Sequence, residues 1–475
     1  MQKEYINLGT TKVFNGNYML AVFYIETYNN QDLLSAASEI AAESSTGTNK
    51  RVNTVTPFSD ELNAIVYKIN EEKNLAYIAY PFRIFDRGGN IQNIMTFIAG
   101  NIFGMSNLKA CKLLDIHFPT AMFPHYDGPS VNIDDLRRYL NNYHKPILGT
   151  IIKPKIGLTP NEYAEVCYDF WSAGGHFVKN DEPQADQEFA PFAKSVTAVK
   201  EAMQKAEDKT GETKIHSFNI SSADFDTMIK RAEYIINTMP KGSYAFLVDG
   251  ITAGWTAVQT IRRRFPDVFL HFHRAGHGAF TRAENPIGFS VPVLTKMARL
   301  AGASGIHTGT AGIGKMADGI HNDDIISAHI ALKLKSEGLY FDQIWSEIPE
   351  NDEDTQKAIK KEEELWSQGP LNLSRKRYKA QKLEEYWPEW RVIKKTTPIA
   401  SGGLTPLSLA PFIEKVGTID FITTMGGGIH SHPEGTSSGV KAVLQAFDAW
   451  YNQIPIDEYA KEHRELELAI EKFQK

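Results

Sequence analysis

Eight short apolar segments recur from residue 147 onward, and each ends in polar or glycine residues before a helical stretch. Strands that alternate with helices in this way predict a parallel sheet. Eight such units fit a closed (β/α)8 barrel, which needs about 250 residues before insertions. An open, doubly wound sheet is the structural alternative. In chain order the segments are ILGTIIKP, HFVKNDE, KIHSFNI, YAFLVDG, FLHFHRA, GIHTGT, PIASGG and FITTMGGG.

The chain before these segments has a mixed α+β pattern. YMLAVFYIET, LNAIVYKIN and NLAYIAYPFRIF are typical of strands, and DLLSAASEIAAESS predicts a helix that ends at Gly47. We therefore expect an α/β protein with a smaller α+β N-terminal domain over 1–135. A barrel domain with C-terminal helices would follow over 136–475.

One interval between barrel segments, 311–397, is too long for an ordinary loop. Its part from about 345 to 395 is highly charged, yet it contains Trp366, Trp387 and Trp390. The charge alone favours a solvated helical insertion. Tryptophans in so polar a segment usually need a surface to bury against.

Composition excludes several classes of protein. The 475 residues carry a formal net charge of -6, so there is no electrostatic reason to expect nucleic acid. Two cysteines, Cys111 and Cys167, make no disulfide framework and fit a reducing cytoplasm. The first residues lack the pattern of a signal peptide, and no apolar run is long enough to span a bilayer.

In the second segment, HFVKNDE, Lys179 ends the apolar part, and Asp181 and Glu182 come shortly after it. An inward-facing lysine costs free energy unless something compensates its charge. Lys179 and Asp181 share a face of the strand, and two carboxylates suit Mg²⁺. The lysine could be a base beside the metal, or it could react with CO2 to form a carbamate, an anionic oxygen ligand. A structural ion pair is the alternative.

The first and fifth segments add basic groups at the mouth of the predicted barrel, where such folds place their active sites. Lys153 and Lys155 share a face, and their repulsion would lower at least one pKa, which suits a proton donor or base. HFHRAGH supplies His271, His273 and Arg274, with His277 shortly after; histidine suits acid–base work and arginine suits phosphate. Exposed loop lysines and core histidines are the alternatives.

Glycine-rich turns follow the last three segments. Ser401, Gly402 and Gly403 end the seventh, and Gly426, Gly427 and Gly428 end the eighth, where barrels often bind phosphate. After the sixth, a glycine-hinged loop could close over a substrate and carry Lys315 with it. Gly309 to Lys315 matches a nucleotide-binding P-loop, but Met316 stands where that motif needs Ser or Thr.

Together these motifs resemble the large subunit of ribulose-1,5-bisphosphate carboxylase/oxygenase (Rubisco), more closely the form II and archaeal types than the plant type. The resemblance rests on AAESSTGTN, YDGPSVNI, GTIIKPKIGL, GGHFVKNDEPQ, HFHRAGHGA, GIHTGTAGIGKM and the two glycine clusters. It implies addition of CO2 to ribulose 1,5-bisphosphate to give two 3-phosphoglycerate, with O2 as a competing substrate. A Rubisco-like enolase or isomerase of sulfur metabolism, a P-loop hydrolase and a non-catalytic assembly protein are the alternatives.

The resemblance implies a role for each catalytic group. Lys179, carbamylated by an activating CO2, would bind Mg²⁺ with Asp181 and Glu182 and would help remove the C3 proton. Lys153 would serve proton transfers, and His273 would assist acid–base and hydration steps. The remaining implied catalytic residues are Lys315, which would stabilise the new carboxylate, Glu43 and Asn101.

The resemblance also implies how the substrate is held. Thr48, Gly403, Gly426 and Gly427 would bind one phosphate, while Arg274 and His307 would bind the other. The full implied substrate-binding set is Thr48, Asn49, Asn101, Lys153, Lys155, Arg274, His307, Lys315, Ser401, Gly402, Gly403, Gly426 and Gly427.

The implied assembly is a homodimer at least, because in this family the N-terminal domain completes the site of a neighbouring subunit. We expect no small subunit, and we hypothesise that the insertion docks on a neighbouring subunit and builds dimers into a ring. His176 stands where the family commonly has aspartate. It precedes Lys179 by three residues on the strand, so we expect it to face away from the lysine.

Overall fold

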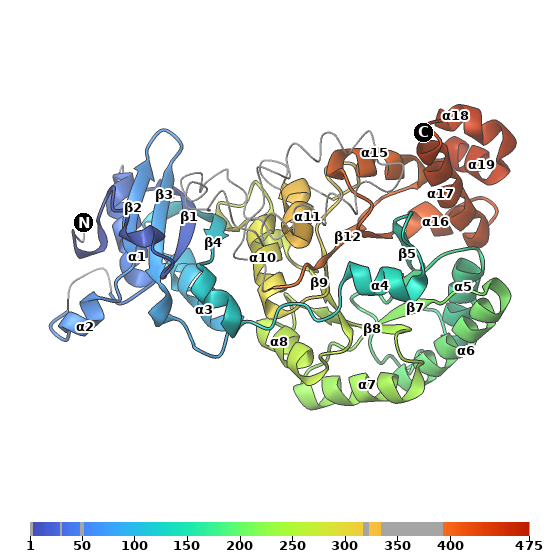
Figure 1. Ribbon diagram of the computed structural model, residues 1–475, viewed down its shortest axis with the longest axis horizontal. Coiled ribbons are helices and arrows are strands. Elements are labelled where there is room, and N and C mark those ends of the chain that lie inside the picture. The colour runs from blue at the N-terminus through green and yellow to red at the C-terminus, as the bar shows by residue number, and fades with distance from the viewer. Residues whose placement is uncertain (1–2, 29–30, 48–51, 317–322, 334–392, 475) are drawn as a thin grey trace, which may run out of the picture.

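The structure is a computed structural model, and it describes residues 3–28, 31–47, 52–316, 323–333 and 393–474. It confirms the predicted fold class, an α+β N-terminal part followed by a closed parallel barrel. Figure 1 shows the N-terminal sheet at one end of an elongated molecule and the C-terminal helices at the other. Within the described residues no helix has the length and apolar character needed to cross a membrane.

All eight predicted barrel segments form strands, and the sheet closes with β13 beside β5. Each neighbouring pair is parallel, so all strands point their carboxyl ends to one rim. The strands are β5 (Ile147–Ile151), β6 (Phe177–Lys179), β7 (Ile215–Asn219), β8 (Tyr244–Asp249), β9 (Phe269–His273), β11 (Gly305–His307), β12 (Thr397–Ser401) and β13 (Ile422–Thr424).

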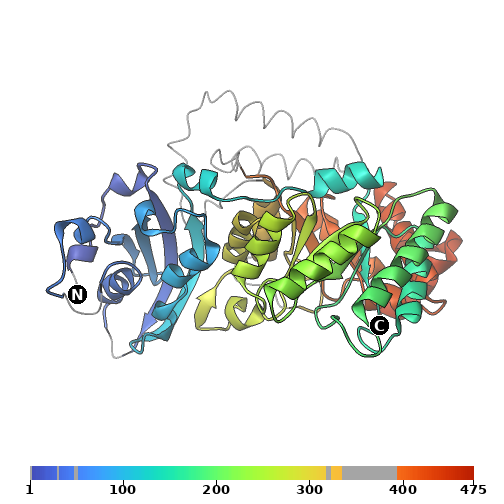
Figure 2. The ribbon, with the colours of Figure 1, turned by 90° about the horizontal axis from the view of Figure 1, so that it is seen from below.

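Helices surround this barrel and follow its strands in the chain (Figures 1 and 2). Local sequence explains where they begin: the Thr159 side chain caps α5 in a reciprocal box with Glu162, and Pro160 occupies the first turn. The surrounding helices are α5 (Pro160–Ser172), α6 (Phe192–Thr210), α7 (Phe225–Thr238), α8 (Trp255–Arg264), α10 (Val291–Ala301), α11 (Asp323–Lys333), α15 (Pro406–Val416) and α17 (Thr436–Tyr451). The C-terminal α19 (Arg464–Phe473) packs on α17.

Helix α4 (Ile133–Leu140) lies across the N-terminal end of the barrel. Its Ile133, Leu136 and Leu140 pack in one buried cluster with Ile147 and Phe177 from the barrel interior. This apolar layer closes one end of the barrel. The polar side chains at the carboxyl ends of the strands therefore lie at the opposite, open end.

The N-terminal sheet has five strands in the order β10-β4-β1-β3-β2. They are β1 (Tyr18–Thr27), β2 (Ile65–Asn70), β3 (Leu75–Pro81), β4 (Leu108–His117) and β10 (Ile287–Phe289). Helix α1 (Leu33–Glu43) packs against β1, β2 and β3. The sequence predicted that this helix ends at Gly47. It ends earlier, at Glu43, and the chain then turns over Ser44 to Thr46.

Strand β10 comes from the barrel half of the chain and pairs in parallel with β4. The sequence did not indicate this strand, which has only three residues. Two further contacts join the same halves: Ser290 donates to the carbonyl of Leu114, and the fully buried Lys296 forms an ion pair with Asp115. The two parts of the molecule therefore share one sheet and one buried charge pair.

The fully buried Arg299 of α10 holds the two ends of the interval 334–392. Its guanidinium donates to the carbonyls of Ile330 (2.7 Å), Ile393 (2.9 Å) and Lys394 (2.9 Å). The chain therefore leaves the barrel and returns to it at one place. Nearly all of the predicted insertion, with its tryptophans, lies outside the described residues.

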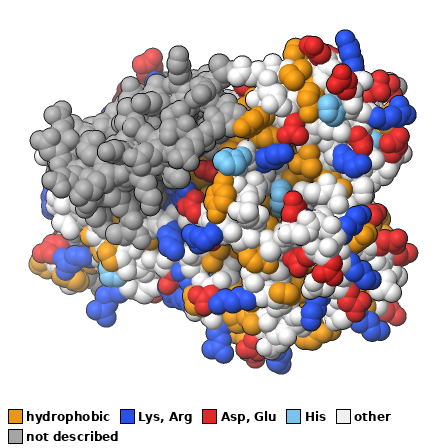
Figure 3. All heavy atoms as spheres, turned by 45° about the vertical axis from the view of Figure 1, so that its right-hand side comes forward, with side chains coloured by type: hydrophobic (Ala, Val, Ile, Leu, Met, Phe, Trp, Pro, Cys, Tyr) orange, Lys and Arg blue, Asp and Glu red, His pale blue; other side chains and the backbone are white. Residues whose placement is uncertain are grey.

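The visible face beside the grey atoms carries basic and acidic side chains intermixed (Figure 3). This distribution agrees with the mild net charge of -6.

We expect Arg299→Met to lower the free energy of unfolding by about 3 kcal/mol, because two buried carbonyls and one half-buried carbonyl would each lose a donor worth about 1 kcal/mol. Urea denaturation followed by circular dichroism would measure the loss. Arg138→Met is the control, since that side chain is exposed and only pairs with Asp135 on the helix surface. Equal, small losses in both variants would contradict the anchoring role of Arg299.

Candidate active site

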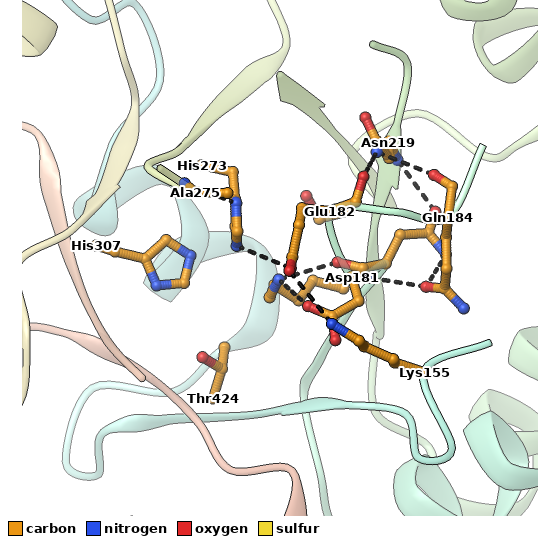
Figure 4. Close-up of polar contacts among 12 residues, drawn as sticks. Lys155, Asp181, Glu182, Gln184, Asn219, His273, Ala275, His307 and Thr424 are labelled. Atoms are coloured by element: carbon orange, nitrogen blue, oxygen red, sulfur yellow. Dashed lines mark hydrogen bonds and ion pairs between the residues drawn. The ribbon is translucent and has the colours of Figure 1, made fainter. Parts of the chain in front are cut away.

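Charged side chains from neighbouring barrel strands meet at the open end of the barrel (Figure 4). Lys179 ends β6, Asp249 ends β8 and His273 ends β9, while Asp181 and Glu182 follow β6 directly. In a parallel barrel all these positions lie on one rim, so residues far apart in the sequence become neighbours. The predicted cluster around Lys179 is thus brought together by the fold.

Lys179 is only 1% exposed. Its Nζ lies 3.6 Å from Asp181 Oδ1 and donates to the carbonyl of Asn180 at 3.0 Å. Burial lowers the pKa of Lys179, although the carboxylates of Asp181 and Glu182 oppose that shift. A lowered pKa increases the fraction of Lys179 that is a neutral amine at a given pH, and the neutral amine is the form that reacts with CO2.

The two carboxylates that follow Lys179 have different environments. Burial opposes the ionised form of Asp181, but hydrogen bonds and the Lys179 and Lys153 charges hold its pKa below the usual value. A hydrogen bond with Asp181 and burial raise the pKa of Glu182. Two carboxylates so close together repel each other when both are ionised. A cation placed between them would relieve this repulsion.

Two lysines from the turn after β5 reach these carboxylates, although both lie beyond the end of the strand on which they were predicted to share a face. Lys153 Nζ lies 2.8 Å from Asp181 Oδ2, and Lys155 Nζ lies 3.5 Å from Glu182 Oε1. Both side chains are partly exposed, so they border the opening of the site. Both lie in the turn beyond the strand, as in the alternative of exposed loop lysines, but each forms an ion pair with one of the two carboxylates.

Asp181, Glu182 and His273 each offer one ligand atom, and these three atoms lie within 4.8 Å of one another. The two carboxylate oxygens are the ligands that Mg²⁺ prefers, and Lys179 as an ammonium could not be a third. As a carbamate it would offer a further oxygen. The donor set therefore fits a hard divalent cation.

Three histidines form a stack beside the carboxylates. His271 Nε2 lies 2.8 Å from His307 Nε2, and the His273 ring lies against His307 in an edge-on contact. Burial holds the pKa of all three imidazoles well below the usual value. They are therefore neutral near pH 7.

Asp249 was not predicted from the sequence. Its Oδ1 lies 3.2 Å from His273 Nδ1, and burial raises the pKa of Asp249 to about 6. The signal that could have identified it is its position, because Asp249 is the last residue of β8 as Lys179 is the last residue of β6.

The glycine-rich turns after β12 and β13 lie close to Lys315 and Lys153. A Cβ on Gly426 would lie 2.9 Å from Lys153 Cε, and a Cβ on Gly403 would lie 2.8 Å from the backbone nitrogen of Lys315. The backbone N–H of Lys315 also donates to the carbonyl of Gly402 at 2.8 Å. At Gly403, where φ is +90°, only glycine permits this approach, and both contacts show that the turns after β12 and β13 border the same opening.

The other predicted residues have three different locations. Arg274 is buried directly after His273, Ser401 ends β12, and Gly427 begins the short helix α16 (Gly427–His430). Glu43 and Asn101 lie together in the N-terminal part, where Asn101 Nδ2 donates to Glu43 Oε1 at 3.3 Å. Figure 1 shows α1, which Glu43 ends, well apart from the barrel. Thr48 and Asn49 lie outside the described residues.

His176 contacts the opposite end of the barrel from this site. Its Nδ1 accepts the backbone N–H of Leu148 at 3.2 Å, and burial lowers the pKa of His176 to about 4. Its ring is therefore hydrogen-bonded to the backbone of β5 and faces away from Lys179, as expected.

Comparisons with known proteins agree with this architecture. Residues 5–122 match the model of the ribulose bisphosphate carboxylase large chain, N-terminal domain, and residues 132–351 and 375–473 match that of its catalytic domain. A ribulose bisphosphate carboxylase of Rhodobacter capsulatus is 39% identical, over 97% of this chain and 92% of its own length. One of Rhodopseudomonas palustris is 40% identical, over 99% of this chain and 95% of its own.

Solved structures of archaeal Rubiscos are similar as well. The dimeric enzyme of Hyperthermus butylicus superposes with a TM-score of 0.81 at 31% identity, covering 99% of this chain and 98% of its own. The octameric enzyme of Pyrococcus horikoshii, solved with a sulfate ion, also gives 0.81, at 29% identity over 99% and 96%. The chain belongs to the ribulose bisphosphate carboxylase large-chain family and is an enzyme of that family.

Proposed function

We propose that this enzyme adds CO2 to ribulose 1,5-bisphosphate to give two 3-phosphoglycerate, with O2 as a competing substrate. The observation that carries the proposal is the buried Lys179 beside Asp181 at the open end of the barrel. Lys153 pairs with the same aspartate, and His273 Nε2 lies 3.8 Å from Glu182. The family and the names of the relatives support carboxylation over the other reactions considered.

Activation begins at Lys179. The ammonium first loses one proton. The neutral amine then attacks the carbon of CO2, an N–C bond forms while one C=O π pair moves onto oxygen, and a second proton leaves the nitrogen, so a cationic side chain becomes an anionic carbamate. The carbamate, Asp181 and Glu182 would then hold Mg²⁺ through oxygen atoms. Bound there, Mg²⁺ would stabilise negative charge on the oxygens of the enediol form of the substrate.

The residues around this centre would move the protons. The Lys179 carbamate would help take the proton from C3, and His273, neutral because it is buried, would assist acid–base and hydration steps. Lys153, whose Nζ already lies against Asp181, would return a proton in the final step. Lys315, on the glycine-hinged loop, would stabilise the carboxylate that CO2 becomes.

The substrate phosphates would occupy two places on the same rim. Gly403, Gly426 and Gly427 would bind one phosphate through their backbone amides, together with Thr48. At Gly403 a side chain would collide with the backbone nitrogen of Lys315. Arg274 and His307 would bind the other. Ser401, Gly402, Asn49 and Lys155 complete the proposed substrate contacts.

Glu43 and Asn101 would act in the site of a second chain, because within this chain they lie in the N-terminal part. A homodimer is then the smallest active unit, with 1–135 as the part that completes the neighbouring site. The structural relatives are named as dimeric and octameric enzymes, which supports a homo-oligomer. We propose that no small subunit is needed, and that the enzyme works in the cytoplasm.

The first experiment is fixation of labelled CO2 into acid-stable 3-phosphoglycerate, after preincubation with bicarbonate and Mg²⁺. We expect the wild type to require the preincubation, and Lys179→Ala to lose at least about a thousandfold in turnover, because the metal centre would lack one ligand. Lys214→Ala is the matched control: Lys214 is equally buried but lies at the start of β7, bonded to Gly175 and Glu212. We expect its folded fraction to retain turnover.

Fixation by Lys179→Ala would refute the carbamate assignment. A folded, activated wild type that fixes no CO2 would instead favour the enolase or isomerase reaction of a Rubisco-like protein, and phosphorylated sulfur-sugar substrates would be assayed next.

We expect Lys315→Ala to separate the two halves of the reaction. The variant should still release tritium from substrate labelled at C3, because Lys179, Asp181 and Glu182 are unchanged, but carboxylation should fall at least about a hundredfold. Tritium release and labelled CO2 fixation would be measured on the same preparation. Equal losses in both assays would contradict a role for Lys315 that begins after enolisation.

The proposed role of the insertion in assembly can be tested by deletion. Residues 352–374 lie within the predicted insertion and between the two stretches that match the catalytic-domain model, so a short Gly/Ser linker would replace them. We expect the deletion to convert a ring into dimers, seen as a lower mass by light scattering. An unchanged mass would rule out the ring-building role.

A further inference from the structure

Glu182 lies beyond the last residue of β6 that is paired with a neighbouring strand. The β6–β7 ladder ends at Lys179 opposite Ser217, and the last backbone bond joins Asn180 N–H to the carbonyl of Ser217. After this point the chain leaves the sheet with two adjacent carboxylates on it. Something other than the sheet must fix the backbone of Asp181 and Glu182.

Asn219, the last residue of β7, fixes one side of this loop (Figure 4). Its side chain is buried, with only 2% of the residue exposed. Its Nδ2 donates to two carbonyls at once, that of Glu182 at 2.9 Å and that of Gln184 at 2.9 Å. An amide nitrogen has two N–H groups, so both are used on the loop.

The other polar groups of Asn219, its Oδ1 and its backbone N–H, are also hydrogen-bonded. Its Oδ1 accepts the backbone N–H of Ser221 at 2.9 Å, and its backbone N–H donates to Asn180 Oδ1 at 3.0 Å. The side chain therefore cannot turn without breaking several hydrogen bonds. Rigidity of this kind is what a residue needs in order to position another.

Gln184 fixes the same loop from within. Its Oε1 accepts the backbone N–H of Asp181 at 2.7 Å and Asn180 Nδ2 at 3.2 Å. The backbone N–H of Asp181 and the carbonyl of Glu182 are thus each tied to a neutral amide. No charge is brought near the carboxylates by this arrangement, so their attraction for a cation is preserved.

We propose that Asn219 is a positioning residue that sets the affinity of the site for a divalent cation by fixing the backbone of Glu182, with Gln184 as its partner at Asp181. The inference rests on the proposed function, in which Asp181 and Glu182 are metal ligands. Residues that orient metal ligands typically change metal affinity 10- to 100-fold when they are replaced.

The test uses the full-length enzyme and Mn²⁺ as a spectroscopic probe. Free Mn²⁺ is followed by electron paramagnetic resonance as protein is titrated, with and without bicarbonate. We expect Asn219→Ala to raise the half-saturating Mn²⁺ concentration at least about tenfold. The KM for ribulose bisphosphate should change less than about twofold, and a large excess of metal should restore most of the turnover, because no group that touches the substrate is lost.

Asn142→Ala is the matched control. Its side chain also bridges two backbone groups, Lys145 N–H at 3.3 Å and the carbonyl of Pro146 at 3.4 Å, but at the opposite end of the barrel. A wild-type Mn²⁺ titration is expected for it. Thermal denaturation of each variant shows whether a changed affinity is merely a consequence of lost stability.

If Asn219→Ala does not fold, Gln184→Ala provides the same test. Gln184 is only half-buried, so its removal is tolerated more easily, and it should also weaken Mn²⁺ binding. Wild-type Mn²⁺ affinity in a folded Asn219→Ala or Gln184→Ala would overturn the positioning role. If the wild type itself shows no bicarbonate-dependent Mn²⁺ site, the metal assignment under the proposed function fails, and this inference fails with it.

Discussion

A lysine ammonium buried beside an aspartate carboxylate is the interaction on which the rest of this structure depends. Lys179 has almost no contact with water, and Asp181 lies 3.6 Å from its nitrogen. A buried charge is tolerated only when partners compensate it, and here the carboxylates come from the ends of β6 (Asp181 and Glu182) and β8 (Asp249). The closed barrel is what allows separate strands to supply them at one point.

This arrangement also explains why the site is strained electrostatically in the form seen here. Two adjacent carboxylates, a desolvated amine and three neutral histidines are individually unfavourable in a protein interior. If the amine became an anion and a divalent cation bound, ion pairs between three anionic groups and the cation would replace the ion pair between Lys179 and Asp181. Clusters of perturbed groups of this kind mark functional sites more often than they stabilise folds.

The sequence predicted the elements whose signals are local. Eight strands followed by polar residues were recognisable because strand, turn and helix each have a short pattern, and Lys153, Lys179 and His273 sit at fixed places in that pattern. Asp249 and Asn219 were missed because their roles come from contacts across strands. Strand β10 and the anchor Arg299 were missed for the same reason, since their partners lie far away in the chain.

The pairing of β10 with β4 affects how the protein must be made. Until residues 287–289 have left the ribosome, the outer edge of β4 has no partner, and its backbone groups are open to any other strand. The N-terminal sheet is therefore incomplete while most of the barrel is still being synthesised. Chaperones that cover a bare sheet edge would have their longest opportunity during this interval, and the N-terminal part expressed alone would keep that edge permanently.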